Sequence, residues 1–414
     1  MAHWHSNPEI VVIGAGAAGI AAGRRLAGRG RSFLIVEASD RIGGRAHTVE
    51  VAGMPLDLGC GWLHSADRNP WTRTAEAAGL TVDRSPPAWG RQYRDLGFSR
   101  EEQRAAAEAW EAFDRRLRES PPPSDRASDA LEPHGAWNAY LNARSTYVSG
   151  AELDRISIQD MLAYDDADSG ANWRLPGGYG ALIAATGCGL PVAFGAPVER
   201  IDRHGARLRL ETPKGALSAQ AIIVTVPTPL LCDGGLRFDP PLHDKLEAAE
   251  SLPLGLADKL FLALDDAEDL APDSQVIGNP RSQATGSYYL RPFGRPLIEA
   301  FFGGEQARTL ETEGEAAAAA FAAEELAGLF GNAFARRLRP LAATAWGSAA
   351  FSRGSYSHAL PGRAEARERL AAPVEGRIFF AGEACSRADY STAHGARVTG
   401  IAAAEAALAA VPGQ

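Results

Sequence analysis

The chain has 414 residues, 45% of them hydrophobic and 22% charged, a composition typical of an ordinary globular protein and long enough for two or three domains. Its formal net charge of −9 disfavours nucleic acid as the main partner, and we expect none. The four cysteines are widely spaced and predict no disulfide framework, and the histidines form no HxxxH pair and predict no metal site. The sequence shows neither a signal-peptide pattern nor a long apolar run, which predicts a cytoplasmic protein without a membrane segment.

The first predicted unit is a strand, a glycine-rich turn, a helix and a second strand. Gly14, Gly16 and Gly19 form GxGxxG between the strand EIVVI and a helix of small residues. In such a turn the first glycine bends the chain, the second lets the backbone approach a pyrophosphate, and the third lets helix and strand pack closely. Glu37 ends the second strand, where a carboxylate can accept from a ribose hydroxyl. These residues predict a dinucleotide-binding unit.

The segment DRIGGR (residues 40–45) follows that acid and narrows the choice of dinucleotide. A nicotinamide-binding unit would usually run straight on into another helix. Here Gly43 and Gly44 can instead fold back over the pyrophosphate, with Arg45 as its bidentate partner. A hairpin and a helix near residues 71–80 are expected next.

The rest of the chain alternates helices with strands and shows no internal repeat. Residues 99–118 are strongly helical and charged, and more helix is expected to about residue 165. The other expected elements are a helix after a glycine turn at 173–190, antiparallel strands leading into the apolar strand 222–226, strands at 257–264 and 297–302, a helix at 315–330, a strand in 377–386 and a helix at 392–410.

Lys259 occupies an unusual position in the strand LGLADKLFLAL. With a period of two, it shares its strand face with Ala257, Phe261 and Ala263, all apolar. The strand pattern alone leaves two interpretations open. The lysine either extends to the edge of the strand, or faces a site that needs a cation.

Stretches spread over nearly the whole chain resemble the flavin-dependent amine oxidase family of monoamine oxidases, polyamine oxidases and lysine-specific histone demethylases. They include VVIGAGAAGIAAGRRL, VEASDRIGGRAHT, LDLGCGWLH, LADKLFLAL and RIFFAGEACSRADYSTAHGARVTGIAAAEAAL. The resemblance implies an α/β fold, with a Rossmann-like FAD-binding domain and a second substrate domain of mixed sheet and helices. We expect the FAD domain to comprise residues 1–84, 171–235 and 346–414, and the substrate domain residues 85–170 and 236–345.

The same resemblance implies an extended FAD whose flavin ring lies between the two domains. Val198 matches the residue whose backbone meets the adenine, and Glu383 matches the acid that binds a ribityl hydroxyl. The helix that starts near Thr392 would aim its N-terminus at the flavin. The residues expected to bind the cofactor are Gly14, Gly16, Ala18, Gly19, Glu37, Ala38, Gly43, Gly44, Arg45, Gly59, Cys60, Gly61, Trp62, Val198, Trp346, Gly382, Glu383, Thr392 and Ala393.

Five residues match positions around the reacting centre of the family. Lys259 sits where the family places a lysine that reaches flavin N5 through water, which suits reaction with oxygen. Trp346 matches a tryptophan packed against the flavin, and Tyr356 one wall of an aromatic cage for the amine. Thr392 replaces the second aromatic of monoamine oxidases, as in the polyamine oxidase and demethylase branch. His64 matches an active-site histidine of polyamine oxidase-like sequences, although beside a turn it can equally be structural.

The expected reaction follows from these matches and departures. Ser355 replaces the cysteine that carries covalent flavin in monoamine oxidases, so we expect non-covalent FAD. DLGCGWLHS lacks the arginine that would grip an α-carboxylate. We therefore expect O2-dependent oxidation of a polyamine, diamine or secondary amine to an imine, with release of hydrogen peroxide. The alternatives are a dehydrogenase or isomerase that does not use O2, an amino-acid oxidase, or a non-catalytic FAD protein. The particular amine and the oligomeric state stay open.

Overall fold

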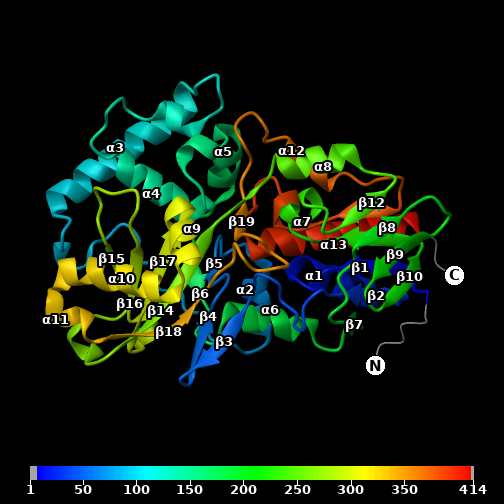
Figure 1. Cartoon of the computed structure of the whole chain (residues 1–414), viewed down its shortest axis with the longest axis horizontal. Helices are drawn as coiled ribbons and strands as arrows, with labels where there is room; N and C mark the ends of the chain where they lie inside the picture. The colour runs from blue at the N-terminus through cyan, green and yellow to red at the C-terminus, as the bar shows by residue number, and fades with distance from the viewer. Residues whose placement is uncertain (1–6, 412–414) are drawn as a thin grey trace.

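The structure is a computed structural model that describes residues 7–411. The first six residues, part of the segment in which we expect no signal peptide, lie outside the described residues. The molecule is elongated, with a parallel sheet in one half and an antiparallel sheet in the other (Figure 1). This arrangement confirms the predicted α/β fold.

The parallel sheet contains the apolar strands found in the sequence. Its order is β20-β11-β1-β2-β7, and every neighbouring pair is parallel. Helices cover one face and a second sheet covers the other, which explains why these strands are apolar on both sides. The bounds are β1 Ile10–Ile13, β2 Phe33–Val36, β7 Val192–Ala193, β11 Ala221–Val224 and β20 Ile378–Phe380, and the second sheet contains β8 Arg200–Asp202, β9 Leu208–Thr212, β10 Gly215–Ala219 and β12 Arg237–Asp239.

Helices α1 (Ala17–Ala27) and α13 (Ala393–Ala410) pack against each other on the parallel sheet. A Cβ atom at Gly400 would overlap the carbonyl oxygen of Ala18, so a glycine is needed where these helices cross. Because α1 follows β1 and α13 follows β20, both helices start at the carboxyl edge of the sheet. This edge is where ligands bind in open α/β sheets.

The antiparallel sheet has the order β15-β16-β17-β14-β18. Leu260, Leu262 and Leu264 of the interior strand β14 pack with helices α9 and α10 in one apolar core. The alternate residues of that strand therefore face the opposite side, toward the parallel sheet's edge. The bounds are β14 Ala257–Leu264, β15 Ser274–Ile277, β16 Ser287–Leu290, β17 Leu297–Gly303, β18 Leu338–Ala343, α9 Gly304–Glu313, α10 Glu315–Phe330 and α11 Asn332–Ala335.

Three helices form a further layer beside the antiparallel sheet (Figure 1). They are α3 (Arg100–Glu119), α4 (Asn138–Ser149) and α5 (Ile158–Ala167). The remaining elements are β3 Thr48–Val51, β4 Met54–Asp57, β5 Trp62–Leu63, α2 Pro70–Ala77, β6 Trp173–Arg174, α6 Tyr179–Gly187, α7 Thr228–Cys232, α8 His243–Glu250, β13 Leu254–Gly255, β19 Tyr356–Ser357 and α12 Ala366–Ala371.

The sequence located the main elements correctly but overextended some ends. The strand expected in residues 377–386 stops at Phe380, because Gly382 has a φ of +138° and a short 3-10 turn follows it. Within residues 7–411, no helix is long and apolar enough to cross a membrane. The limits of the two expected domains stay a prediction.

Candidate active site

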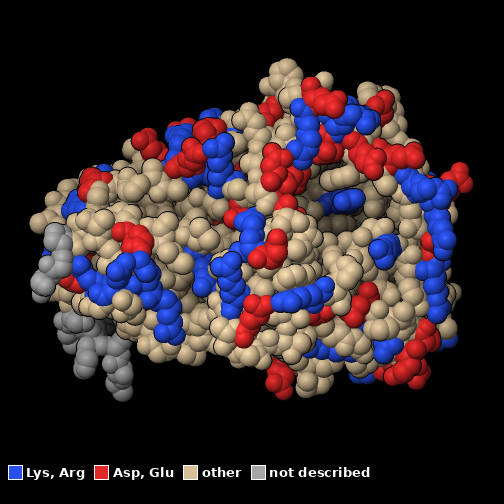
Figure 2. Space-filling view, turned by 180° about the vertical axis from the view of Figure 1, so that it is seen from behind, with Lys and Arg blue, Asp and Glu red and all other residues tan. Residues whose placement is uncertain are grey.

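A cavity of about 1050 Å³ lies between the carboxyl edge of the parallel sheet and the antiparallel sheet. Its walls include the turn after β1, the ends of β2 and β11, strands β14 and β17, and parts of helices α3, α4 and α5. Small-ligand pockets span roughly 300–1,000 Å³, so this cavity has room for a large cofactor together with a substrate. Figure 2 shows the molecule hollowed over the half that holds the antiparallel sheet, with basic side chains inside the hollow.

The glycine turn at one end of the cavity has the geometry of a phosphate cradle. Gly14 has a φ of +103°, and a Cβ atom there would lie 2.6 Å from the Thr225 hydroxyl oxygen. A Cβ atom at Gly19 would overlap the carbonyl oxygen of Gly14, so this glycine serves helix–strand packing. Gly16 faces the cavity, and no side chain caps the first N–H groups of α1. A helix N-terminus without a side-chain cap can bind an anion.

The second glycine pair packs onto this cradle. The Gly43 N–H donates to the Ala15 carbonyl at 2.8 Å, and a Cβ atom at Gly44 would lie 3.2 Å from the Cα of Gly16. Glu37 is buried beside it and accepts from the Ala15 N–H at 2.6 Å and from the Ser39 hydroxyl at 2.7 Å. The residues that the sequence placed around the pyrophosphate and ribose are therefore adjacent.

Arg45 and Glu383 form an ion pair that the sequence did not predict. Arg45 Nη1 lies 2.9 Å from Glu383 Oε1 and donates to the Ser355 carbonyl at 2.7 Å. Burial by itself would raise the pKa of Glu383, but Arg45 and the Ser357 hydroxyl, which donates at 2.6 Å, hold that pKa below its ordinary value. An ionised carboxylate thus lines the cavity, where it can accept from a ligand hydroxyl.

Lys259 projects from β14 into the cavity and is 8% exposed. Its Nζ donates to the Asp57 carbonyl at 2.9 Å and lies 2.8 Å from Glu299 Oε1. Glu299 is opposite Phe261 in strand β17, so it lies on the same sheet face as Lys259. The expectation that this lysine has only apolar neighbours holds along its own strand but is wrong across the sheet. One N–H of Lys259 is thus bonded and its charge is paired with Glu299, and a Cβ atom at Gly61 would approach its Nζ to 3.3 Å.

Asp57 anchors the loop that contacts this lysine. Its carboxylate accepts from the Tyr179 and Gly180 N–H groups at 2.9 and 3.1 Å, at the N-terminus of α6. Burial raises the pKa of Asp57, while the Thr48 hydroxyl and these amides oppose the shift. The carboxylate therefore fixes the loop, and its carbonyl fixes the lysine.

Two aromatic side chains from the segment after β18 line the same part of the cavity. The Trp346 indole donates to the Leu58 carbonyl at 3.2 Å. The Tyr356 hydroxyl donates to the Tyr147 carbonyl at 2.7 Å, and burial raises its pKa, so it stays neutral. The ring of Tyr356 is thereby fixed between β19 and α4 as one rigid wall.

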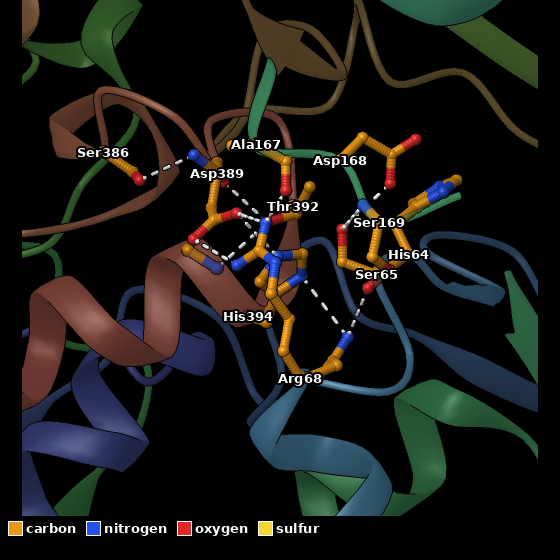
Figure 3. Close-up of polar contacts among 12 residues, drawn as sticks. His64, Ser65, Arg68, Ala167, Asp168, Ser169, Ser386, Asp389, Thr392 and His394 are labelled. Carbon is orange, nitrogen blue, oxygen red and sulfur yellow. Dashed lines mark hydrogen bonds and ion pairs between the residues drawn. The ribbon is translucent and has the colours of Figure 1, made fainter. Parts of the chain in front are cut away.

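Thr392 and His64 come from loops that meet at the other side of the cavity (Figure 3). Thr392 is the N-cap of α13, because its hydroxyl accepts from the Gly395 N–H at 2.9 Å. His64 Nδ1 lies 2.6 Å from the Asn172 side-chain oxygen, and burial lowers the histidine pKa, so the ring is neutral at pH 7. The helix end and the neutral imidazole both face the cavity.

A cluster that the sequence missed connects these two loops (Figure 3). Arg68 donates to the Ala167 carbonyl at 2.7 Å and pairs with Asp389 at 2.5 Å. Asp389 also lies 3.1 Å from His394 Nε2, in the first turn of α13. Burial would raise the pKa of Asp389, but His394 and Arg68 keep it well below its ordinary value. Arg68 therefore ties the end of α5 to the start of α13.

Asp165 of α5 also lines the cavity, where it is half-buried and forms no ion pair with another of residues 7–411. Burial raises the pKa of Asp165 to about 6. The carboxylate is still mainly ionised at neutral pH, so it makes this wall attractive to a cation. Apart from Gly19, every residue that the sequence assigned to the site lines the cavity, although their individual roles stay predictions.

A glycine turn at a helix N-terminus, joined to a large cavity with a buried lysine, is typical of a dinucleotide-dependent α/β enzyme. The chain belongs to the flavin containing amine oxidoreductase family, which matches residues 17–159 and 157–408. It is therefore a flavin-dependent oxidoreductase of the amine oxidase type, as the sequence motifs indicated.

Individual relatives agree over almost the full chain. Polyamine oxidase 2 of Arabidopsis thaliana is 28% identical over 436 residues, which cover 96% of this chain and 88% of the relative. Polyamine oxidase 4 of Oryza sativa subsp. japonica is 29% identical, covering 97% of this chain and 88% of the relative. A structure of putrescine oxidase bound to putrescine superimposes with a TM-score of 0.76 at 20% identity, covering 97% of this chain and 99% of that chain. The superposition shows a shared fold.

Proposed function

We propose that this chain is an FAD-dependent oxidase that converts a polyamine, diamine or secondary amine to an imine and reduces O2 to hydrogen peroxide. The imine then hydrolyses to an aldehyde and an amine or ammonia. The observation that carries this proposal is Lys259, held almost fully buried on the cavity wall by Asp57 and Glu299. The domain limits given by the sequence belong to the same proposal.

The cradle fits a dinucleotide such as FAD. Gly16 and the N-terminus of α1 would receive the pyrophosphate, and Glu37 the adenosine ribose. Glu383 would accept from a ribityl hydroxyl, and the first turn of α13 would face the flavin ring with its positive end. A bound flavin would supply the chemistry, taking a hydride equivalent from the carbon beside the amine nitrogen and passing electrons to O2.

Binding without a covalent bond is part of the proposal. Ser355 stands where the covalent members of the family carry a cysteine. The cysteine among the cavity-lining residues is Cys60, and burial raises the pKa of its thiol to about 12. A thiol that stays protonated is a poor nucleophile, so Cys60 offers no substitute linkage.

Lys259 has a defined part in this reaction. The Asp57 carbonyl receives one N–H and Glu299 balances the charge, so a further N–H would be available to a ligand in the cavity beside Gly61. A fixed positive charge there stabilises negative charge that develops on O2, without reorganisation of water. The same N–H can pass a proton to the product peroxide.

The cavity suits an extended amine without a carboxylate beside the nitrogen. Tyr356 forms one wall, and Thr392 also lines the cavity with a short side chain in place of a second aromatic ring. The Tyr356 ring face attracts a cation, and Asp165 offers a carboxylate for a second ammonium farther along the cavity. Two of the relatives described above are polyamine oxidases by name, which favours the same class of substrate.

The test is a spectrum of the holoenzyme titrated with a panel of amines without oxygen, followed by air. An oxidase bleaches with its substrate, recovers within seconds of aeration and releases one peroxide for each amine. Bleaching without rapid recovery would instead indicate a dehydrogenase. No bleaching with any amine or amino acid would favour a non-catalytic protein or an isomerase, and reduction by amino acids alone would indicate an amino-acid oxidase.

A further inference from the structure

Two acids lie beneath the turn that carries Trp346. Asp258 precedes Lys259 in β14 and is 6% exposed, and Glu311 lies near the end of α9. Asp258 Oδ1 accepts from the Trp346 N–H at 3.0 Å and from the Thr344 hydroxyl at 2.7 Å. Glu311 accepts from the next two backbone N–H groups, those of Gly347 and Ser348, at 2.9 and 2.5 Å. Three consecutive amides are thus held by two carboxyl groups.

The two carboxyl groups bind neighbouring amides of the same turn, so they are close to each other. Asp258 Oδ2 is buried, and no donor among the described residues reaches it. Glu311 is nevertheless close enough to Asp258 to raise the pKa of that carboxyl group. Two ionised carboxylates in such a place would repel each other strongly, whereas one shared proton gives Oδ2 a donor and Glu311 a partner.

A glycine permits this approach of Glu311 to the turn. A Cβ atom at Gly347 would lie 2.8 Å from Glu311 Oε2 and 3.1 Å from its Oε1. Any side chain at position 347 would push the carboxylate away. The turn and the acid are therefore fitted to each other independently of their charge state.

We propose that Asp258 and Glu311 share one proton and act as positioning residues that fix Trp346 and the backbone of Lys259 at the cavity wall. The Thr344 hydroxyl, which donates to Asp258, also accepts from the Lys259 N–H at 2.8 Å. The Thr344 N–H donates back to the Lys259 carbonyl at 2.9 Å. The acid pair thus supports both residues without touching a bound cofactor, and its link to catalysis rests on the proposed function.

The shared proton makes the turn sensitive to pH. Burial and Glu311 raise the pKa of Asp258 to about 7. The titratable groups that bear on Asp258 are Glu311 from α9 and Tyr356 from β19, and Tyr356 stays neutral because burial raises its pKa. When residues 346–348 are hydrogen-bonded to the two acids, the pair holds a proton. When these hydrogen bonds break and the turn opens to water, that proton is released between about pH 4 and 7. Opening therefore becomes easier as pH rises to about 7 and changes little above it.

The experiment is hydrogen exchange of the holoenzyme, followed by mass spectrometry on peptides that contain residues 344–349. After correction for intrinsic exchange, the wild type should lose protection by at least about tenfold between pH 5 and 8, since each pH unit contributes up to about tenfold. Asp258→Asn keeps a neutral donor toward Glu311, so its protection should not depend on pH. Asp265→Asn, just beyond β14 and paired with Arg339 at the surface, is the matched control and should behave as wild type.

The proposal of a shared proton would be overturned if protection in the wild type did not change with pH. It would also be overturned if Asp258→Asn lost protection between pH 5 and 8 as the wild type does. If Asp258→Asn fails to fold, Glu311→Gln takes its place, and its protection should likewise not depend on pH. Because exchange needs no turnover, these results stand apart from the amine assay. If the protein oxidises no amine but its protection falls between pH 5 and 8, the inference about the acid pair holds and only the proposed function is refuted.

Discussion

Removal of the Lys259 charge should affect stability and oxygen chemistry separately. Lys259 Nζ and Glu299 Oε1 are 2.8 Å apart, an attraction of about 6 kcal/mol at an effective dielectric constant near 20. Desolvation offsets part of this, and the 23% exposure of the Glu299 side chain screens more. Breaking a buried pair costs about 3–5 kcal/mol, so we expect about 3 kcal/mol for Lys259→Met in urea unfolding of the holoenzyme.

The Glu299→Gln variant is the control for the stability loss expected of Lys259→Met. Lys259→Met leaves an unpaired carboxylate, whereas Lys259→Met with Glu299→Gln leaves none, so the double variant should recover about 2 kcal/mol of coupling energy in the cycle. Lys214→Met removes an exposed lysine and should change stability by less than about 0.5 kcal/mol. A coupling energy near zero would contradict the ion pair as a stabilising contact.

Kinetics then test the role of the charge. The double variant should still be reduced by amine without oxygen, but stopped-flow reoxidation should slow by about 10–1000-fold, or about 1.4–4 kcal/mol of barrier. Wild-type reoxidation in a variant that lacks Lys259 would refute the assigned role. Loss of reduction with unchanged reoxidation would place the lysine in the other half-reaction.

Four further outcomes are expected. Acid precipitation should release the flavin into the supernatant, and flavin retained in the pellet would indicate a covalent bond. The kcat/KM for a polyamine or secondary alkylamine should exceed that for benzylamine by about tenfold, or about 1.4 kcal/mol, and benzylamine as the best substrate would contradict the open cage. Because the pKa of Asp165 is about 6, protonation should lower kcat/KM for a diamine, relative to a monoamine of equal length, as pH falls through about 6, and Asp165→Asn should remove this difference. Gly19→Ala should reduce flavin content and lower stability by about 1–3 kcal/mol through overlap with Gly14, while Gly328→Ala, with open space around its Cβ position, should not destabilise.

Local sequence determined the end of the cavity that carries the glycine turn. Gly14, Gly16, Gly19 and Glu37 lie within one βαβ unit, so chain connectivity alone brings them together at the carboxyl edge of the sheet. The positive φ of Gly14 and the missing Cβ of Gly19 are requirements of the backbone itself. Local periodicity likewise located the apolar strands, and it predicted the long amphipathic helix α3 almost to the residue.

The partners of the charged groups were decided by the tertiary structure. Arg45 and Glu383 are 338 residues apart, and no local pattern relates them. The period of β14 showed which face Lys259 occupies, but it could not show that β17 places Glu299 on that face. Strand order and register are set by the packing of the whole sheet, and they decide which charged side chains come into contact across it. In a buried site these contacts determine the protonation state and reactivity of each group.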